Sequence, residues 1–447
     1  MTLNLDVRAS ALARGEETRP APVSDHDVLR LALQGAAVLF ANGETTERTV
    51  AAAARIAAAH GRGAIVLPRW GELTVRTDAD PGALHDVVAV TPAGIDMNKV
   101  LETERAIAAI ESHELPLEAA ASTFRTIAAL PPVSLARFAL AAAVGAAALG
   151  IVFGAEHPLS IVLIALSAAA GALLRRGLAR VSTNPFLQPF SAALLAGVIG
   201  GLAQRQELSS PLALIALCPC MVLVPGPHFL NGLIDLLRAR VSLGCSRLAF
   251  ALLVVAAISA GVLLGLWGVG ATLPLSPPAR SIPLLIDVVA AGFAVYAYGS
   301  FYSLRWRFLP TPIAVGMIAR ALRSSAISLG ASAAAAAFLA CLLVGSVMTP
   351  LGNRLRLPFA ALSFAAVVAL IPGVFLFRMA GGLVQIAELG EKAPASLASV
   401  ILGDGGTSLL ILLAMGFGLV APHLLAERVR PAAAASDGKG EAHAGAS

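Results

Sequence analysis

Long apolar runs fill the chain from residue 134 to residue 425, whereas residues 1–130 mix apolar with charged positions. A helix that crosses a bilayer needs about 20 apolar residues. Ten runs meet or approach that length, at 134–154, 159–174, 186–204, 210–225, 247–269, 282–302, 309–322, 326–347, 358–375 and 405–425. The pattern predicts a multi-pass α-helical membrane protein with about ten transmembrane helices, of which the run at 309–322 is the shortest.

The first part of the chain contains short helical and strand-like stretches, as a small folded domain does. Apolar residues at helical spacing follow Ser24, end at Asn42-Gly43 and resume after Thr45 or Thr46. Strand-like runs at 64–67, 73–77 and 86–91 follow, and then helical stretches at 96–112 and 116–129. We expect an N-terminal cytosolic α/β domain over residues 24–130, after a flexible N-terminus of residues 1–23.

Two Pro-Gly pairs end apolar runs at matching places in the two halves of the membrane part. They are Pro225-Gly226 and Pro372-Gly373. Proline removes a backbone donor and glycine loosens the chain, so a helix stops or unwinds there. Five spans per half would place the second half upside down relative to the first. The pattern predicts two inverted five-helix repeats, at 131–275 and 276–428, with a binding site at the interrupted helices.

Composition and charge agree with a membrane protein. The chain is 57% hydrophobic and 13% charged, against roughly 25% charge in a soluble domain. Arginines gather in the connections that lie inside if the first domain is cytosolic, so both termini are expected to be cytosolic. The net charge of +5 then reflects topology and not nucleic-acid binding. Residues 429–447 are rich in Ala and Gly and predict a disordered tail.

Motifs for enzymatic chemistry are absent from the sequence. It has no G-x-x-x-x-G-K nucleotide loop, no H-E-x-x-H metal motif and no G-x-S-x-G nucleophile in a span. The spacing of Cys218-Pro219-Cys220 fits neither the usual zinc nor the thioredoxin pattern. We therefore predict a protein that is not an enzyme and that has no catalytic residue, metal or cofactor. A transporter is the leading class, and a membrane receptor is the alternative that would not need two matching helix breaks.

Asp287 is the acid that lies inside an expected span, 282–302. A lone acid at membrane depth is costly and usually faces a partner or a water path. Desolvation would raise its pKa, which suits a group that binds and releases a proton. The alternative is a residue near a helix end that reaches the interface, about six residues away.

Other polar candidates flank the breaks. Asn231 and Asp235 follow the first break four residues apart, so they share a helix face and could meet a hydroxyl and an ammonium group. Asp235 is also a candidate for proton coupling, beside Asp287. Pairing of Asp235 with a nearby arginine is the structural alternative. The remaining candidates for substrate binding are His228, as a gate or a helix cap, Arg378, and a stripe at the start of the third span that contains Asn184 and Gln188.

Over about 400 residues, the order of several short motifs resembles the bacterial threonine/serine exporter family, with both halves fused in one chain. The stretches are Asn42-Gly43-Glu44-Thr45-Thr46-Glu47, Ile95-Asp96-Met97-Asn98-Lys99-Val100, Leu117-Glu118-Ala119-Ala120, Pro225-Gly226 with Asn231-Gly232 and Asp235, and Pro372-Gly373. One departure is Arg378, which stands where the internal repeat would place an equivalent of Asn231.

The resemblance implies ten spans, a bacterial inner-membrane location and a cytosolic first domain. It also implies export of small hydroxy amino acids, threonine and serine, driven by the proton motive force. Relatives split into two subunits are linked to succinate-type dicarboxylates, so export of a C4 dicarboxylate is the alternative. The expected partners are an amino-acid substrate, protons and the lipid bilayer, without nucleic acid. A homo-oligomer is left open.

Overall fold

The N-terminal part of the computed structural model consists of a three-stranded antiparallel sheet and four helices, of which the first two pack on the sheet and the other two on those helices. The model describes residues 24–77, 86–155, 157–206, 213–273, 282–355 and 359–444, so the expected flexible N-terminus, 1–23, lies outside them. The elements are α2 (Asp25–Ala41), α3 (Thr46–Ala58), β1 (Ala64–Arg69), β2 (Gly71–Thr77), β3 (Asp86–Val90), α4 (Met97–Glu111) and α5 (Leu117–Ala128). The strand order is β1-β2-β3.

Side-chain caps start the helices of this part where the sequence predicts them. Ser24 accepts a hydrogen bond from the backbone of Asp27, and Thr45, not Thr46, does so from Arg48. Asp96 caps α4. Because Thr45 takes the capping role, the hydroxyl of Thr46 is available for a contact outside its own helix.

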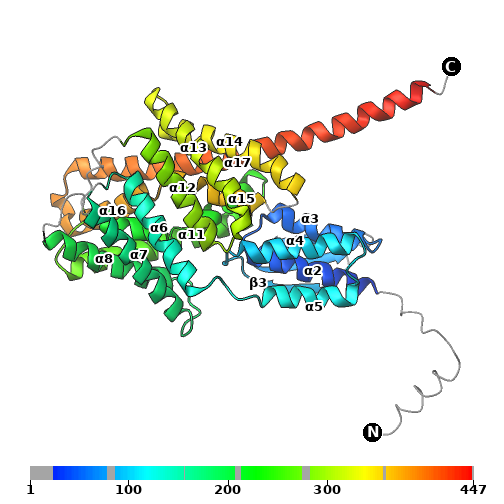
Figure 1. The fold of residues 1–447 in the computed structure, drawn as a ribbon, viewed down its shortest axis with the longest axis horizontal. Coiled ribbons are helices and arrows are strands. Elements are labelled where there is room, and N and C mark those ends of the chain that lie inside the picture. The colour runs from blue at the N-terminus through cyan, green and yellow to red at the C-terminus, as the bar shows by residue number, and fades with distance from the viewer. Residues whose placement is uncertain are drawn as a thin grey trace, which may run out of the picture.

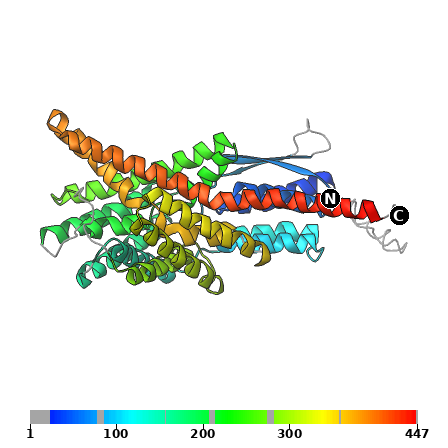
Figure 2. The ribbon, with the colours of Figure 1, turned by 90° about the horizontal axis from the view of Figure 1, so that it is seen from above.

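Long helices form the rest of the chain and extend away from the N-terminal part (Figure 1, Figure 2). They are α6 (Leu135–Val152), α7 (Pro158–Leu178), α8 (Leu187–Arg205), α9 (Ala213–Met221), α10 (Gly226–Leu237), α11 (Val241–Gly268), α12 (Leu284–Phe301), α13 (Pro310–Ser328), α14 (Ala333–Leu355), α15 (Phe359–Val367), α16 (Gly373–Leu389) and α17 (Ala395–Ala444). Single 3₁₀ turns lie at Trp306–Phe308, Val368–Leu370 and Gly390–Lys392.

Eight of the described helices are long and apolar enough to cross a membrane, or nine if α9 and α10 form one broken span. The chain is therefore a multi-pass helical membrane protein, with fewer such helices than the ten that the sequence predicts. The expected seventh span corresponds to α13, which carries Arg320 and Arg323 and does not reach the required apolarity. The expected ninth span ends early, because Pro372 separates the short α15 from α16.

Helices pair in the same order in the two halves of the membrane part. In the first half α6 packs on α7, α7 on α8, and α8 along α11; in the second, α12 packs on α13, α13 on α14, and α14 along α17. Helices α6 and α12 join the halves. The terminal helix α17 returns toward the N-terminal part (Figure 2). It stays helical through residues 429–444, where composition predicts a disordered tail; its alanines favour helix.

Glycines allow the closest of these helix pairs to form. A methyl group at Gly265 in α11 would lie 2.3 Å from the carbonyl oxygen of Leu194 in α8. In the second half, a methyl group at Gly418 in α17 would lie 2.7 Å from the carbonyl of Phe338 in α14. Both pairs therefore bring backbone against backbone, as small residues permit in membranes.

Replacing Gly265 by Ala should separate α8 from α11, since the added carbon meets backbone that cannot move aside alone. Overpacking of this kind typically costs about 1–3 kcal/mol. We expect a lower midpoint for heat-induced aggregation of the detergent-solubilised protein. Gly177→Ala is the matched control, because nothing lies within 4 Å of a methyl group there. Equal midpoints for the two variants would contradict the close-packing account.

Candidate substrate site

Both Pro-Gly pairs interrupt helices in the same way. Pro225 is the N-cap of α10 with φ −80° and ψ 63°, and Pro372 is the N-cap of α16 with φ −80° and ψ 46°. Helices α9 and α10 meet at an angle of 54° across the first break. The sequence prediction that helices stop at these residues is confirmed.

The two breaks lie against each other. A methyl group at Gly226 would lie 2.4 Å from Cδ1 of Ile371, the residue before Pro372. Likewise, one at Gly373 would lie 3.4 Å from Cγ of Met221. Segments that are about 150 residues apart in sequence thus share one contact in the middle of the helical bundle.

Side chains from α12 and α13 bond carbonyl groups beside the breaks. The Tyr298 hydroxyl donates to the Met221 carbonyl at 2.9 Å, and Nη1 of Arg320 donates to the Ala369 carbonyl at 3.3 Å. Unpaired backbone groups are costly away from water, so these bonds stabilise the unwound segments. The breaks are therefore supported by specific partners from the second half.

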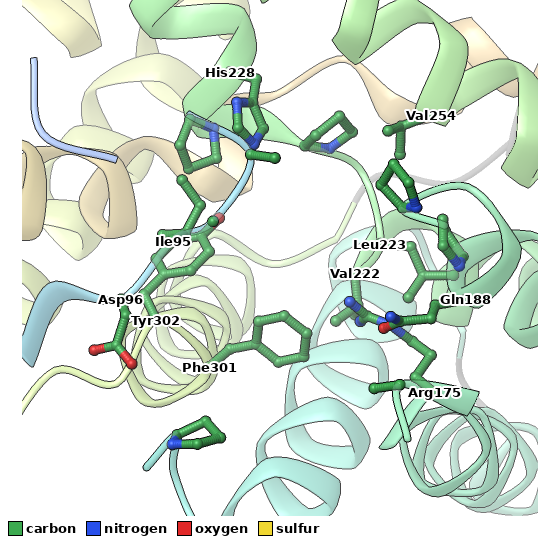
Figure 3. A pocket seen from close by; sticks show the side chains of 18 of the residues that line it. Ile95, Asp96, Arg175, Gln188, Val222, Leu223, His228, Val254, Phe301 and Tyr302 are labelled. Atoms are coloured by element: carbon green, nitrogen blue, oxygen red, sulfur yellow. The ribbon is translucent and has the colours of Figure 1, made fainter. Parts of the chain in front are cut away.

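A cavity of about 460 Å³ reaches the first break from the side of the N-terminal part. This volume is typical of small-molecule sites. Its lining includes the 93–96 loop before α4, the end of α7, the start of α8, residues 222–228 and the end of α12. Among the predicted residues, Pro225, His228 and Gln188 line it. Figure 3 shows Arg175 and Gln188 on one side, Asp96 on another, and His228 above them.

Charged groups give this cavity two kinds of anchor. Arg175 and Arg176 supply positive charge, whereas Asp96 supplies a carboxylate. Burial raises the pKa of Asp96 above its ordinary range, although hydrogen bonds from the backbone of Lys99 and the side chain of Ser303 oppose the shift. A zwitterion carries both complementary charges, so a cavity of this composition suits an amino acid.

His228 is buried and lies edge-on to Phe250, with ring centroids 5.0 Å apart. Its Nδ1 has no hydrogen-bond partner among the described residues. The side chain therefore keeps an unused polar atom beside the cavity, and its role as a gate stays a prediction.

Asp287 in α12 accepts three hydrogen bonds from side chains of α13. Oδ2 accepts a bond from Nε of Arg320 at 2.9 Å, and Oδ1 accepts one from Nη2 at 2.7 Å. The Ser324 hydroxyl also donates to Oδ2, at 2.7 Å. Asp287 is 6% exposed. The acid has a specific partner, as expected of an intramembrane acid, and through Arg320 it connects to the second break.

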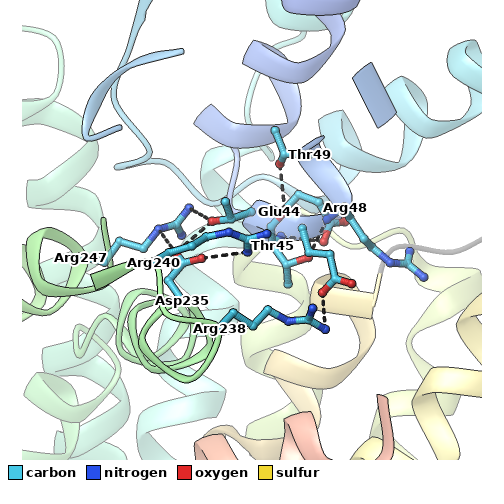
Figure 4. Close-up of polar contacts among 10 residues, drawn as sticks. Glu44, Thr45, Arg48, Thr49, Asp235, Arg238, Arg240 and Arg247 are labelled. Carbon is cyan, nitrogen blue, oxygen red and sulfur yellow. Dashed lines mark hydrogen bonds and ion pairs between the residues drawn. The ribbon is translucent and has the colours of Figure 1, made fainter. Parts of the chain in front are cut away.

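Asn231 and Asp235 lie elsewhere, at the contact between α10 and the N-terminal part. Figure 4 shows Asp235 in this contact. Nδ2 of Asn231 donates to the Gly43 carbonyl at 3.1 Å, and the Thr46 hydroxyl donates to Oδ2 of Asp235 at 2.9 Å. Neither residue lines the large cavity. Both residues thus contact the N-terminal part and lie outside the cavity lining, and their predicted substrate-binding role stays a prediction.

Arginines complete this docking contact. Asp235 lies 3.2 Å from Nε of Arg247 and 3.5 Å from Nη1 of Arg240. Arg247 also donates to the Thr46 hydroxyl at 3.3 Å, and Arg238 pairs with Glu47 instead of Asp235. The Asn-Gly-Glu-Thr-Thr-Glu motif is therefore the surface by which the N-terminal part holds the helix after the first break.

Glu44, in the same motif, should make the stability of this contact depend on pH. Complete burial raises the pKa of Glu44 from 4.5 to about 7, although Arg48 and the backbone of Thr45 oppose the shift. A raised pKa means that the folded state takes up a proton, so stability is greatest below pH about 4.5 and falls as pH rises to about 7. Over this pH range, the titration of Glu44 changes the free energy of unfolding by roughly 3 kcal/mol.

Glu44→Gln keeps the shape and removes this titration. Hydrogen exchange of α2 and α3 in the full-length protein should become faster in the wild type between pH 5 and pH 7, relative to the variant measured at each pH. If the ratio of exchange rates between the wild type and Glu44→Gln stays constant from pH 5 to pH 7, burial does not raise the pKa of Glu44.

Besides Asn231 and Asp235, the cavity lining also excludes five other predicted substrate residues: Gly226, Pro372 and Gly373 at the breaks, Arg378 and Asn184. Arg378 in α16 is 3.2 Å from Oδ2 of Asp404 in α17, and both are nearly buried. Asn184 precedes α8, where its Oδ1 accepts a bond from the backbone of Phe186. Asn184 is exposed, whereas Gln188 lines the cavity. The two residues of the predicted polar stripe therefore do not face the same site.

The residues that sequence reasoning missed are arginines. Arg175 and Arg320 are absent from the residues that the sequence predicts for the site, where arginines indicate only the topology. A signal was present, since each lies four residues after a glycine in the second helix of its half, at Gly171 and Gly316. An arginine inside an apolar helix would have pointed to a buried partner.

Comparison with known proteins adds three findings. A family model described as "Putative threonine/serine exporter" matches residues 30–267, and a second one, "Threonine/Serine exporter, ThrE", matches residues 287–425. A protein of Mycobacterium tuberculosis called "Probable threonine/serine exporter" is 25% identical over 411 residues, which cover 84% of this chain and 76% of that protein. No solved structure matches.

Proposed function

Because the chain belongs to the threonine/serine exporter family, whose members are transporters and not enzymes, we propose that it exports threonine and serine across the bacterial inner membrane. The proton motive force drives this export. Residues 24–130 form a cytosolic domain, and residues 131–275 and 276–428 form two inverted membrane repeats with both termini in the cytosol.

The contact between the two helix breaks carries this proposal. Interrupted helices that meet at the centre of a membrane protein typify transporters with inverted repeats. The matching order of helix pairs in the two halves supports the repeat. Backbone-to-backbone packing in both α8–α11 and α14–α17 supports it further. A rocking of one half against the other would then move access from one side of the breaks to the other.

Access in this structure is from the side of the N-terminal domain. The 460 Å³ cavity is lined by that domain and by the first break. Beside the second break, Arg320 bonds the Ala369 carbonyl and pairs with the carboxylate of Asp287. This asymmetry supports an inward-facing state that receives cytosolic substrate.

Asp287 is the proposed proton-coupling group. Protonation would neutralise its charge and weaken both bonds to Arg320, which also holds the Ala369 carbonyl of the second break. A change of charge is thereby linked to the segment that must move. Asp235, the other candidate, pairs with two arginines in the docking contact and is better suited to hold the N-terminal domain.

A C4 dicarboxylate is the second candidate substrate. The observation in its favour is that Arg175 and Arg176 both line the cavity. Against it, Arg176 already donates to the Val133 carbonyl at 3.0 Å, and Asp96 lines the same cavity. An ammonium group complements this acid better than a second carboxylate does.

Counterflow into proteoliposomes tests the assignment of substrate. Vesicles loaded with unlabelled threonine should accumulate labelled threonine and serine transiently, and succinate should compete weakly. Counterflow with succinate that exceeds that with threonine would move the protein to the dicarboxylate function. Absence of counterflow with every compound would remove the transporter proposal and favour a receptor.

A further inference from the structure

Arg175 and Arg320 occupy corresponding places in the two halves. Each lies in the second helix of its half, four residues after a glycine, in α7 and α13. Each also lies beside the segment that precedes a Pro-Gly break. Arg320 bonds the carbonyl of Ala369, three residues before Pro372, and Arg175 lines a pocket with Val222, three residues before Pro225.

The partner on the first helix of each half differs. Arg320 makes a two-pronged contact with the carboxylate of Asp287, the fourth residue of α12. The fourth residue of α6 is Phe138, and the guanidinium of Arg175 lies 5.5 Å from the centroid of its ring. At this helix position the second half thus has a carboxylate where the first half has a phenyl ring.

Two N–H groups of the Arg175 guanidinium are left without hydrogen-bond acceptors among the described residues. Within the described part of the chain, its Nε and Nη1 atoms are buried and have no hydrogen-bond partner. Packing against the rings of Phe138 and Phe301, at 5.5 and 5.3 Å, accounts for its position. Packing does not satisfy the two N–H groups, and a buried donor without an acceptor is costly.

We infer that Arg175 binds the carboxylate of the transported substrate. The substrate carboxylate takes the place that Asp287 holds against Arg320 in the second half, and a guanidinium matches it with two parallel bonds. Gln188 lies on the same side of the cavity and offers an amide (Figure 3). The identity of the substrate rests on the proposed function; the binding of a carboxylate rests on the geometry of Arg175.

Arg175→Gln should raise the half-saturating threonine concentration for counterflow about 30-fold or more, as loss of one partner of a buried charge pair does. Arg175→Lys keeps the positive charge but lacks the planar guanidinium that makes two parallel bonds. Its half-saturating threonine concentration should lie between those of Arg175→Gln and the wild type. Arg180→Gln is the matched control, because Arg180 is exposed just beyond the same helix. Its half-saturating concentration should stay at the wild-type value.

A ligand series gives a second measurement that needs no variant. L-threonine amide keeps the ammonium and hydroxyl groups and lacks the carboxylate, so the wild type should bind it far more weakly than L-threonine. If Arg175→Gln weakens competition by succinate as well as binding of threonine, Arg175 binds the carboxylates of both compounds. The discrimination against threonine amide should disappear in Arg175→Gln.

Equal competition by threonine and threonine amide in the wild type would overturn the inference, as would an unchanged half-saturating concentration in Arg175→Gln. In both of these cases wild-type counterflow would persist, so the exporter proposal would stand. Absence of counterflow in the wild type would instead remove the proposed function itself.

Discussion

Replacing Asp287 by Asn should abolish gradient-driven threonine export and leave part of the threonine–threonine exchange. The substitution keeps the shape and the position beside Arg320, yet removes the carboxylate that the proposed proton coupling requires. Loss of a positioned proton carrier typically lowers a rate by about 100-fold or more. The measurement is threonine flux from proteoliposomes, with and without an imposed proton gradient.

Two further variants make this prediction specific. Asp287→Glu keeps a titrating carboxylate and should retain gradient-driven flux at a reduced rate. Asp404→Asn makes the same chemical change in the other nearly buried acid–arginine pair of the second half, with Arg378, and should remain coupled. Full gradient-driven export by Asp287→Asn would remove this acid from the coupling mechanism.

Filling the contact between the two breaks should stop transport. Gly226→Leu places a branched side chain where even a methyl group would lie 2.4 Å from Cδ1 of Ile371. Overpacking of about 1–3 kcal/mol at a moving contact would hold the halves apart or jam them, and counterflow should fall at least about tenfold. Ile371→Ala in the same chain makes room and should restore a large part of the flux.

Gly406→Leu is the control for the added side chain, because Gly406 in α17 is exposed and nothing lies within 4 Å of a methyl group there. That variant should transport as the wild type does. A Gly226→Leu protein with normal counterflow would show that the two breaks do not need to stay in contact, and the alternating-access proposal would lose its structural support.

Local sequence signals predicted the elements of the N-terminal part closely. Caps at Ser24 and Asp96, the Asn42-Gly43 stop and the alternating strand residues act over a few positions, so they can be read one element at a time. The breaks at Pro225 and Pro372 were predicted for the same reason, since proline and glycine affect their own backbone.

Partners that depend on tertiary contact could not be predicted in this way. Asp235 and Asn231 share a helix face, as their spacing indicates, but spacing does not say which surface that face meets; it meets the N-terminal domain. Arg320 joins Asp287 across 33 residues, and α13 was ranked by apolarity, which counts an arginine as an interruption and not as a partner.

Measurement of threonine flux through the purified protein tests most directly whether a proton gradient drives export. Proteoliposomes loaded with labelled threonine should release it when a proton gradient is imposed. This efflux should stop when a protonophore collapses the gradient, and ATP should not change it. Threonine efflux that ignores the gradient, or that requires ATP, would contradict the account.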